Sequence, residues 1–152
     1  MALYIVPTPI GNLGDITRRA VEVLAQVDFV IAEDSRYTLK LLSHLGLRKR
    51  IISHYRPREE EQGERIVAML AAGQDGALVT DSGTPAISDP GHILVRMAIA
   101  AGVAVVPLPG PTALVPALAA SGIDPRRFLF LGFPPRSAGE LRSFLAGVAR
   151  LP

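Results

Sequence analysis

The chain has 152 residues and a net charge of only +2, which is too small to establish a nucleic-acid partner without a clustered distribution of charge. Hydrophobic residues make up 49% and charged residues 20%, which excludes a disordered chain. Cysteine is absent, which excludes disulfides, a catalytic thiolate and a cysteine-bound metal. The first predicted element, residues 3–6, is a short apolar strand with no basic lead before it, and no apolar run is long enough for a membrane span. We therefore expect a cytoplasmic protein with no membrane partner.

Short apolar segments alternate with helical patterns along the rest of the chain. The predicted strands are 3–6, 28–32, 51–55, 77–80, 103–107 and 128–131. Asp15 is predicted to cap the first helix. The later helices are predicted at 37–45, from Glu59 to about Gly73, at 92–101, from Ala113 to about Ala120, and at 139–149.

The repeated order of strand and helix, with strands apolar on both faces, is typical of a parallel sheet covered by helices. The sequence therefore predicts an α/β fold, with a five-stranded, mainly parallel sheet flanked by helices in residues 1–120. A lone strand and helix cannot form a core of their own. Residues 121–152 are accordingly predicted to be a linker and the truncated beginning of a second α/β domain.

Three loops rich in glycine and proline each follow a predicted strand, at 7–14, 81–91 and 107–113. The carboxyl ends of parallel strands lie at one edge of a sheet, so these loops are predicted to converge on one cleft. Glycine lets a ligand approach the backbone, and proline fixes the shape of a loop in advance. One such loop is adequately explained as a tight turn, but three on one edge favour a site for a small polar ligand.

Several common motifs are missing. No G-x-G-x-x-G follows the first strand, and there is no P-loop and no G-x-S-x-G elbow. His44, His54 and His92 have no metal-ligand spacing, so we expect surface or capping histidines and no metal site.

Four acidic residues follow predicted strands at the edge that carries the loops: Glu33, Asp34, Asp81 and Asp89. One of them could act as a general base or orient a donor. The competing interpretation is helix N-capping, which Asp performs in many proteins. For Asp34, Ser35 and Asp89 the two interpretations stand equally, whereas the position of Asp81 at a strand tip favours function.

The densest basic segment contains Arg48, Lys49, Arg50, His54, Arg56 and Arg58, with Tyr55 among them. Such a segment could follow RNA phosphates, with the tyrosine stacking on a base. A solvated connection is the commoner outcome for a short run of charge and is slightly favoured by the residues alone. Arg126, Arg127 and Arg136 form a second, weaker patch.

Four ordered motifs resemble the tetrapyrrole-methylase superfamily. They are residues 7–15 (PTPIGNLGD), 32–36 (AEDSR), 80–91 (TDSGTPAISDPG) and 107–113 (PLPGPTA). Within it, the chain is most similar to the family of rRNA small-subunit methyltransferases I. The resemblance implies two α/β domains with S-adenosylmethionine in the cleft between them, a homodimer, and methylation of the 2′-oxygen of cytidine 1402 in 16S rRNA or the 30S subunit.

Matched residue by residue, the resemblance implies cofactor contacts from Pro9, Ile10, Ser82, Gly83, Thr84, Ile87, Thr112 and Ala113. Ser82, Ser35 and Pro134 depart from the family, in which Ala, Thr and Leu are usual at these positions. Relatives also continue through a complete second domain.

The sulfonium of the cofactor supplies the reactivity, so the protein need only align the ribose oxygen and accept its proton. Asp34 and Asp81 are candidates for that role, and Arg36 is a candidate for holding a phosphate. The RNA-binding candidates are Arg48, Lys49, Arg50, Arg56 and Arg58. The alternatives are a methyltransferase acting on a precorrin or uroporphyrinogen, and an inactive fragment that only binds cofactor or mediates dimerisation.

Overall fold

The computed structural model describes residues 1–54, 59–88 and 91–150. The chain divides into two compact units, residues 1–121 and residues 122–152, and each is described by itself. No helix within the described ranges is long and apolar enough to cross a membrane.

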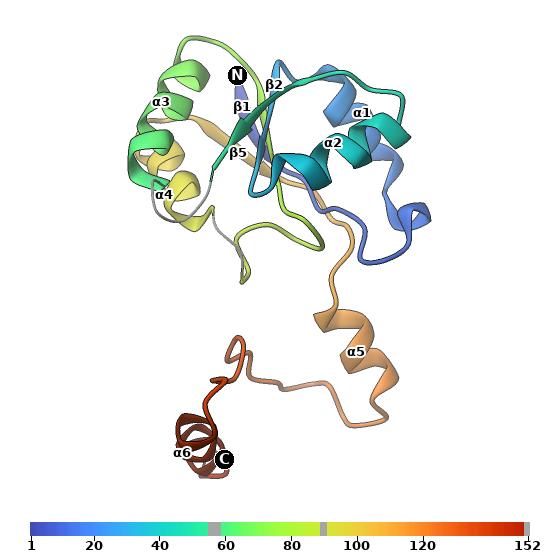
Figure 1. The fold of residues 1–152 in the computed structure, drawn as a ribbon, viewed down its shortest axis with the longest axis vertical. Helices are drawn as coiled ribbons and strands as arrows, with labels where there is room; N and C mark the ends of the chain where they lie inside the picture. Colours follow the sequence, from blue (N-terminus) through green and yellow to red (C-terminus); the bar gives the residue numbers. More distant parts are fainter. Residues whose placement is uncertain (55–58, 89–90, 151–152) are drawn as a thin grey trace. The chain divides into compact units, whose positions relative to one another are not determined.

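The first unit contains a five-stranded sheet of order β3-β2-β4-β1-β5. Strands β1, β2 and β5 of this sheet are labelled in Figure 1. The strands are β1 (Ala2–Ile5), β2 (Phe29–Ala32), β3 (Arg50–Ser53), β4 (Gly76–Val79) and β5 (Ala104–Pro107). All four neighbouring pairs are parallel, so every strand ends at the same edge. The predicted α/β class is therefore confirmed.

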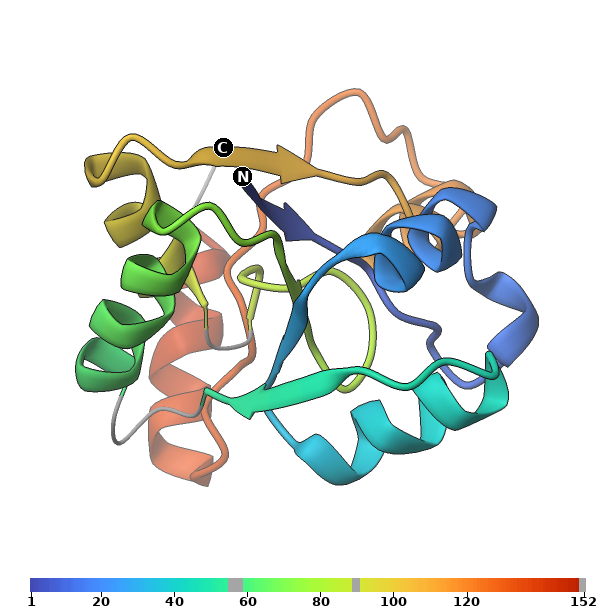
Figure 2. The same cartoon turned by 90° about the horizontal axis from the view of Figure 1, so that it is seen from above.

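Helices cover both faces of this sheet. Those of the first unit are α1 (Arg18–Gln26), α2 (Ser35–His44), α3 (Glu59–Ala71), α4 (His92–Ala100) and α5 (Leu114–Ala120). Figure 2 shows α1 and α2 on one face and α3 and α4 on the other. The second unit contains one helix, α6 (Ala138–Val148), within its described residues.

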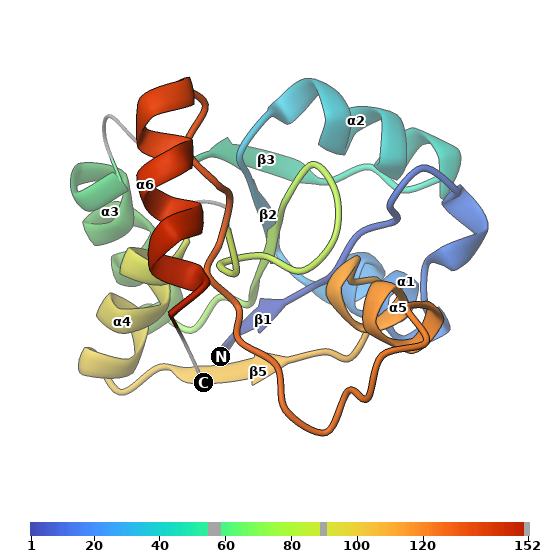
Figure 3. The ribbon, with the colours of Figure 1, turned by 90° about the horizontal axis from the view of Figure 1, so that it is seen from below.

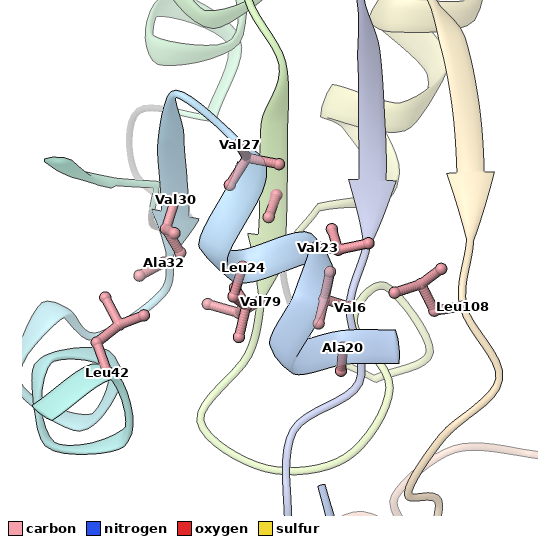
Figure 4. Packing of buried hydrophobic residues seen from close by; sticks show 11 residues of the cluster. Val6, Ala20, Val23, Leu24, Val27, Val30, Ala32, Leu42, Val79 and Leu108 are labelled. Atoms are coloured by element: carbon pink, nitrogen blue, oxygen red, sulfur yellow. The ribbon is translucent and has the colours of Figure 1, made fainter. Parts of the chain in front are cut away.

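Alternation along the strands divides the buried side chains into two clusters. On one face, Val6, Val30 and Val79 pack against Leu24 of α1 and Leu42 of α2 (Figure 4). On the other face the packing involves strands β1, β2 and β4 and helices α3 and α4, through Leu3, Ile5, Phe29, Ile31, Leu78, Ile66, Leu70, Leu94 and Ala98. The central strands β2 and β4 are buried throughout, whereas β3 and β5 at the edges are partly exposed.

The start of α1 differs from the prediction. Asp15 ends a 3₁₀ turn, η1 (Leu13–Asp15), and Ile16 after it is extended. The cap of α1 is instead Thr17, whose hydroxyl accepts a hydrogen bond from the Ala20 N–H at 3.1 Å. Asp and Thr are both good N-cap residues. Asp15 belongs to the 3₁₀ turn, so Thr17 is the residue that caps α1.

Two further predictions are wrong. Residues 128–131 do not form a strand, and their side chains are exposed: 56%, 62%, 45% and 44% for Phe128, Leu129, Phe130 and Leu131. An apolar run becomes a strand only where another strand pairs with it. His54 is buried at 1% exposure, and is not a surface histidine. Its N–H donates to the Ala32 carbonyl at 2.8 Å, which carries the pairing of β3 with β2 beyond Ser53.

Candidate functional site

The loops that follow β1, β4 and β5 meet at the carboxyl edge of the sheet. Thr8 and Gly83 exchange two backbone hydrogen bonds of 2.9 Å. The Thr8 hydroxyl donates to the Thr80 carbonyl at 2.9 Å, and the Thr84 hydroxyl donates to the Pro111 carbonyl at 3.0 Å. The three loops therefore meet at one edge as predicted, although neither of the two pockets described below is lined by all three.

The close contact between these loops depends on glycine at two positions. Gly83 has φ +85°, a backbone conformation that residues with a Cβ rarely adopt. This conformation lets Gly83 form its backbone bridge with Thr8. A Cβ placed on Gly110 would lie 2.7 Å from the Cβ of Pro7, which is closer than real Cβ contacts. In the same region Ala86 has φ +67°, a strained value of the kind that clusters at ligand sites.

A first pocket, which we call the α5 pocket, has a volume of about 590 Å³. Its walls come from the loop after β1, the loop after β5, and α5. It is lined by Ile10, Asp15, Thr17, Gly110, Pro111, Thr112, Val115 and Pro116. Apolar side chains therefore stand beside two hydroxyls and one carboxylate, a combination suited to a small molecule with polar and apolar parts.

The eight predicted cofactor residues all lie on the three loops at this edge, but only Ile10 and Thr112 line the α5 pocket. Ser82 and Ile87 are exposed, whereas Gly83 is buried under Ile10. Thr84 ties two loops together through its hydrogen bond to Pro111. Ala113 occupies the N-cap of α5 without a side-chain cap. Pro9 is buried and faces a different pocket.

That second pocket, which we call the α2 pocket, has a volume of about 260 Å³. It lies between the loops after β1 and β4 and helix α2. It is lined by Thr8, Pro9, Leu13, Tyr37, Thr38, Lys40, Leu41, Thr80 and Asp81. The sequence identified Asp81 as a candidate but missed Tyr37 and Lys40. Their spacing of three residues, directly after the Glu33–Arg36 motif on a predicted helix, is the signal that could have found them.

Asp34 and Arg36 form an ion pair at the start of α2. The Asp34 carboxylate accepts from Arg36 Nε at 3.0 and 3.1 Å and from Nη2 at 2.5 Å. It also caps α2, because Oδ1 accepts from the Arg36 N–H at 2.8 Å. These hydrogen bonds lower the pKa of Asp34 to about 2. Asp34 is thus a helix cap and an anchor for Arg36, and such a weakly basic carboxylate is a poor proton acceptor at neutral pH.

Two further acidic candidates, Asp81 and Glu33, lie at the same edge of the sheet as this pair. The pKa of Arg36 is raised mainly by its hydrogen bonds with Asp34, with a smaller contribution from the charge of Asp81. Arg36 and Asp81 are therefore within electrostatic range of each other. Glu33 is at the same edge and accepts a long hydrogen bond of 3.4 Å from the Thr80 hydroxyl.

The basic segment lies partly at the opposite edge. Arg48, Lys49 and Arg50 precede or begin β3, so they lie at its amino end and away from the loops. The Lys49 ammonium donates to the carbonyls of Ala25 and Val27, both at 2.7 Å, and thereby caps the end of α1. Tyr55, Arg56, Arg58 and Asp89 lie outside the described residues.

The weaker basic patch lies in the second unit, where Arg126 pairs with Asp124 at 2.5 Å. Arg127 lines a shallow pocket beside that pair, and Arg136 lies in the connection before α6. Within the described ranges, no group of three His, Cys, Asp or Glu side chains is placed to hold a metal ion.

Residues 2–150 match the sequence profile of the family described as Tetrapyrrole (Corrin/Porphyrin) Methylases. The chain is 49% identical over 150 residues to ribosomal RNA small subunit methyltransferase I of Escherichia coli O157:H7, covering 99% of this chain and 52% of that protein. The corresponding protein of Pseudomonas aeruginosa is 47% identical over 150 residues, covering 99% and 53%. The chain therefore spans about half the length of the curated relatives it matches.

Solved structures show the same fold. Uroporphyrin III C-methyl transferase from Thermus thermophilus aligns with a TM-score of 0.59 and 22% identity, covering 82% of this chain and 53% of that protein. A conserved hypothetical protein from Aeropyrum pernix K1 aligns with a TM-score of 0.60 and 25% identity, covering 74% and 39%. At 22% identity the first of these likenesses concerns the fold alone.

Proposed function

This chain belongs to the tetrapyrrole methylase family, and we propose that its protein transfers a methyl group from S-adenosylmethionine to the 2′-oxygen of a cytidine in 16S ribosomal RNA. The observation that carries the proposal is the 45–49% identity, over nearly the whole chain, to proteins named ribosomal RNA small subunit methyltransferase I. By the same resemblance, the target is cytidine 1402.

We propose that the loops after β1, β4 and β5 hold the cofactor, with the α5 pocket as its main recess. The volume of about 590 Å³ is within the usual range for small-molecule sites. Ile10 and Val115 offer apolar contact, and the hydroxyls of Thr17 and Thr112 offer hydrogen bonds. When bound, S-adenosylmethionine supplies an electrophilic methyl group. The residues assigned to its binding are Pro9, Ile10, Ser82, Gly83, Thr84, Ile87, Thr112 and Ala113.

The protein's own contribution is positioning and proton transfer. Asp34 holds the Arg36 guanidinium by three hydrogen bonds and its backbone N–H by a fourth, which suits a guanidinium positioned to contact a phosphate. The low pKa of Asp34 disfavours it as the proton acceptor. Asp81 lines the α2 pocket and is our candidate for orienting the ribose hydroxyl or accepting its proton.

We also propose that residues 121–152 begin a second α/β domain, which contributes the rest of the cofactor site, and that the protein acts as a homodimer on the 30S subunit in the cytoplasm. These statements rest on the resemblance of the chain to its family. They imply that S-adenosylmethionine binds the full-length protein more tightly than it binds residues 1–152 alone.

The experiment measures tritiated methyl transfer from S-adenosylmethionine by the full-length protein into 30S subunits, naked 16S rRNA and uroporphyrinogen III. We expect incorporation into RNA, at the ribose of one cytidine. Incorporation into uroporphyrinogen alone would establish the tetrapyrrole alternative. Failure of the full-length protein to bind S-adenosylmethionine by calorimetry would refute the cofactor assignment.

A variant set assigns the roles of the acidic residues. Asp81→Asn is expected to lower kcat by about 10²–10⁴-fold, the usual contribution of acid–base catalysis. Asp34→Asn is expected to act mainly on KM through Arg36. Glu22→Gln is the matched control for both substitutions. Glu22 is a half-exposed carboxylate on α1, and within the described residues its ion pair is with Arg18.

A further inference from the structure

The α2 pocket is separate from the recess assigned to the cofactor, although the two share a wall. Pro9 lines the α2 pocket, and the next residue, Ile10, lines the α5 pocket. In Figure 3 the chain that leaves β1 passes between α2 and α5. A molecule in the α2 pocket would therefore lie on the other side of this loop from a molecule in the α5 pocket. A transferase for two substrates needs such a pair of neighbouring recesses.

The lining of the α2 pocket combines an aromatic ring with a cation. Tyr37 is 55% exposed although it is a large aromatic residue. The Lys40 ammonium lies 5.6 Å from the centroid of the Tyr37 ring, so ring and charge form one unit on the pocket wall. Leu13 and Leu41 supply apolar surface, and Thr80 and Asp81 supply polar groups.

Positive charge continues along the exposed face of α2. Arg36, Tyr37, Leu39 and Lys40 line an adjoining hollow of about 470 Å³, which shares Tyr37 and Lys40 with the α2 pocket. The negative groups near this region are Asp34, which is paired with Arg36, Asp81, and Glu33, which accepts a hydrogen bond from the pocket-lining Thr80. A ligand at this face thus meets the Lys40 ammonium and the ion-paired Arg36 guanidinium on either side of an aromatic ring.

On the basis of the proposed function, we propose that the α2 pocket receives one nucleotide of single-stranded RNA, with its base stacked on Tyr37 and its phosphate beside Lys40. Single-stranded RNA is recognised by splayed bases stacked on aromatic rings, with cations along the backbone. A volume of about 260 Å³ lies near the lower end of small-molecule sites, which suits a single nucleoside.

A second copy of the chain fits this face less well. An interface between copies has a core depleted of charge, whereas here Arg36 and Lys40 lie beside the exposed Leu39.

The test measures binding of a fluorescently labelled single-stranded RNA of the 16S decoding region to full-length protein saturated with S-adenosylhomocysteine. Tyr37→Ala is expected to weaken RNA binding about tenfold, whereas Tyr37→Phe keeps the ring and binds within twofold of wild type. Lys40→Ala is expected to weaken binding and to reduce the slope of log K against log salt by about 0.7. Arg18→Ala is the matched control, because Arg18 is a 93% exposed cation on α1.

Binding of S-adenosylmethionine, measured by calorimetry on the same proteins, is the second readout and is expected to change less than twofold in every variant. RNA binding at wild-type strength by both Tyr37→Ala and Lys40→Ala would overturn the nucleotide pocket. The proposal would also be overturned if sedimentation showed that the variants lose RNA binding because an oligomer of the protein dissociates. If wild type itself neither binds the cofactor nor methylates RNA, the proposed function fails. If wild type does both and the variants are normal, the nucleotide pocket alone fails.

Discussion

Residues 1–121 and residues 122–150 both carry many apolar side chains, but only the first region buries them. Phe29, Leu24 and Leu70 are at 0–1% exposure within the first unit. In the second region, all of which the structure describes, no residue is buried, and Phe133 is 83% exposed. The difference lies in pairing: each strand of the first unit has a parallel neighbour, whereas residues 128–131 have none within their unit.

Polar contacts show the same contrast. In the first unit several of them join distant parts of the chain, as when Thr8 donates to Thr80 and the Ala2 N–H donates to Asp75 at 2.6 Å. In the second region the Asp124–Arg126 and Ser137–Glu140 hydrogen bonds join residues two or three apart. Long-range contacts of this kind hold elements together, whereas local ones stabilise a single turn. An exposed apolar segment at residues 128–133 is what we expect if residues 121–152 begin a second α/β domain, as proposed above.

The largest expected effect on stability comes from replacing a phenylalanine by alanine in each of the two regions. Phe29→Ala in residues 1–152 should lower the free energy of unfolding by about 3–5 kcal/mol, because it leaves a cavity between β2 and α3. Phe130→Ala, at 45% exposure, should change it by less than about 0.5 kcal/mol. Urea unfolding followed by circular dichroism measures both. Equal losses would show that residues 122–150 share the core of the first unit.

The next effect concerns glycine. Gly110→Ala should lower the free energy of unfolding by about 1–3 kcal/mol, because its new methyl group would clash with Pro7 and push the two loops apart. It should also weaken binding of S-adenosylmethionine to the full-length protein.

Gly139→Ala is the matched change in α6, where a Cβ meets nothing within 4 Å. It should leave the unfolding midpoint of the first unit unchanged and raise the helicity of α6 slightly. A loss of stability from Gly139→Ala that matched the loss from Gly110→Ala would contradict the contrast between the regions.

These contrasts also explain what the sequence could predict. The sheet and the converging loops were predictable because two features can be read from short stretches of sequence. These are the spacing of apolar residues in strands and helices, and the glycine and proline residues in the loops between them. The prediction of a strand at 128–131 was wrong because a strand forms only when it hydrogen-bonds to another strand that lies elsewhere in the chain. An apolar run does not show whether such a partner strand is present. Among the residues that line the two hollows beside α2, the sequence named Asp81 as a candidate from its strand-tip position and Arg36 from the motif that follows β2. Tyr37 and Lys40 were missed because their pocket exists only when α2 lies beside Thr8 and Thr80.

A smaller effect separates structural cations from RNA-binding ones. Lys49→Met should cost about 0.5–1.5 kcal/mol of stability, because two carbonyls at the end of α1 lose their donor. Arg48→Met, at an exposed neighbouring position, should be close to neutral. Thermal unfolding and RNA binding are measured on both. If Lys49→Met kept wild-type stability but weakened RNA binding, Lys49 would be an RNA-binding residue and not a structural cap of α1.

The smallest effect compares one motif in the two regions. Asp34 and Asp124 each pair with the arginine two residues later, and both pKa values lie below the ordinary 3.8, that of Asp34 at about 2. A carboxyl whose pKa is lowered in the folded state stabilises that state above its unfolded pKa. For Asp34 this contribution is lost as the pH falls from about 4 to about 2.

Carboxyl ¹³C titration should place the Asp34 midpoint near 2, and Arg36→Gln should return it toward 3.8. Arg126→Gln should do the same for Asp124. In urea the Asp34 midpoint should rise to the ordinary value, because α2 is held on the sheet by Leu41 and Leu42 and its cap is lost with the core. The Asp124 pair needs only a local turn, so its midpoint should move less between native and unfolded conditions. An Asp34 midpoint that stayed low in urea would show that both pairs are local, and that the first unit contributes nothing to the acidity of its own carboxylate.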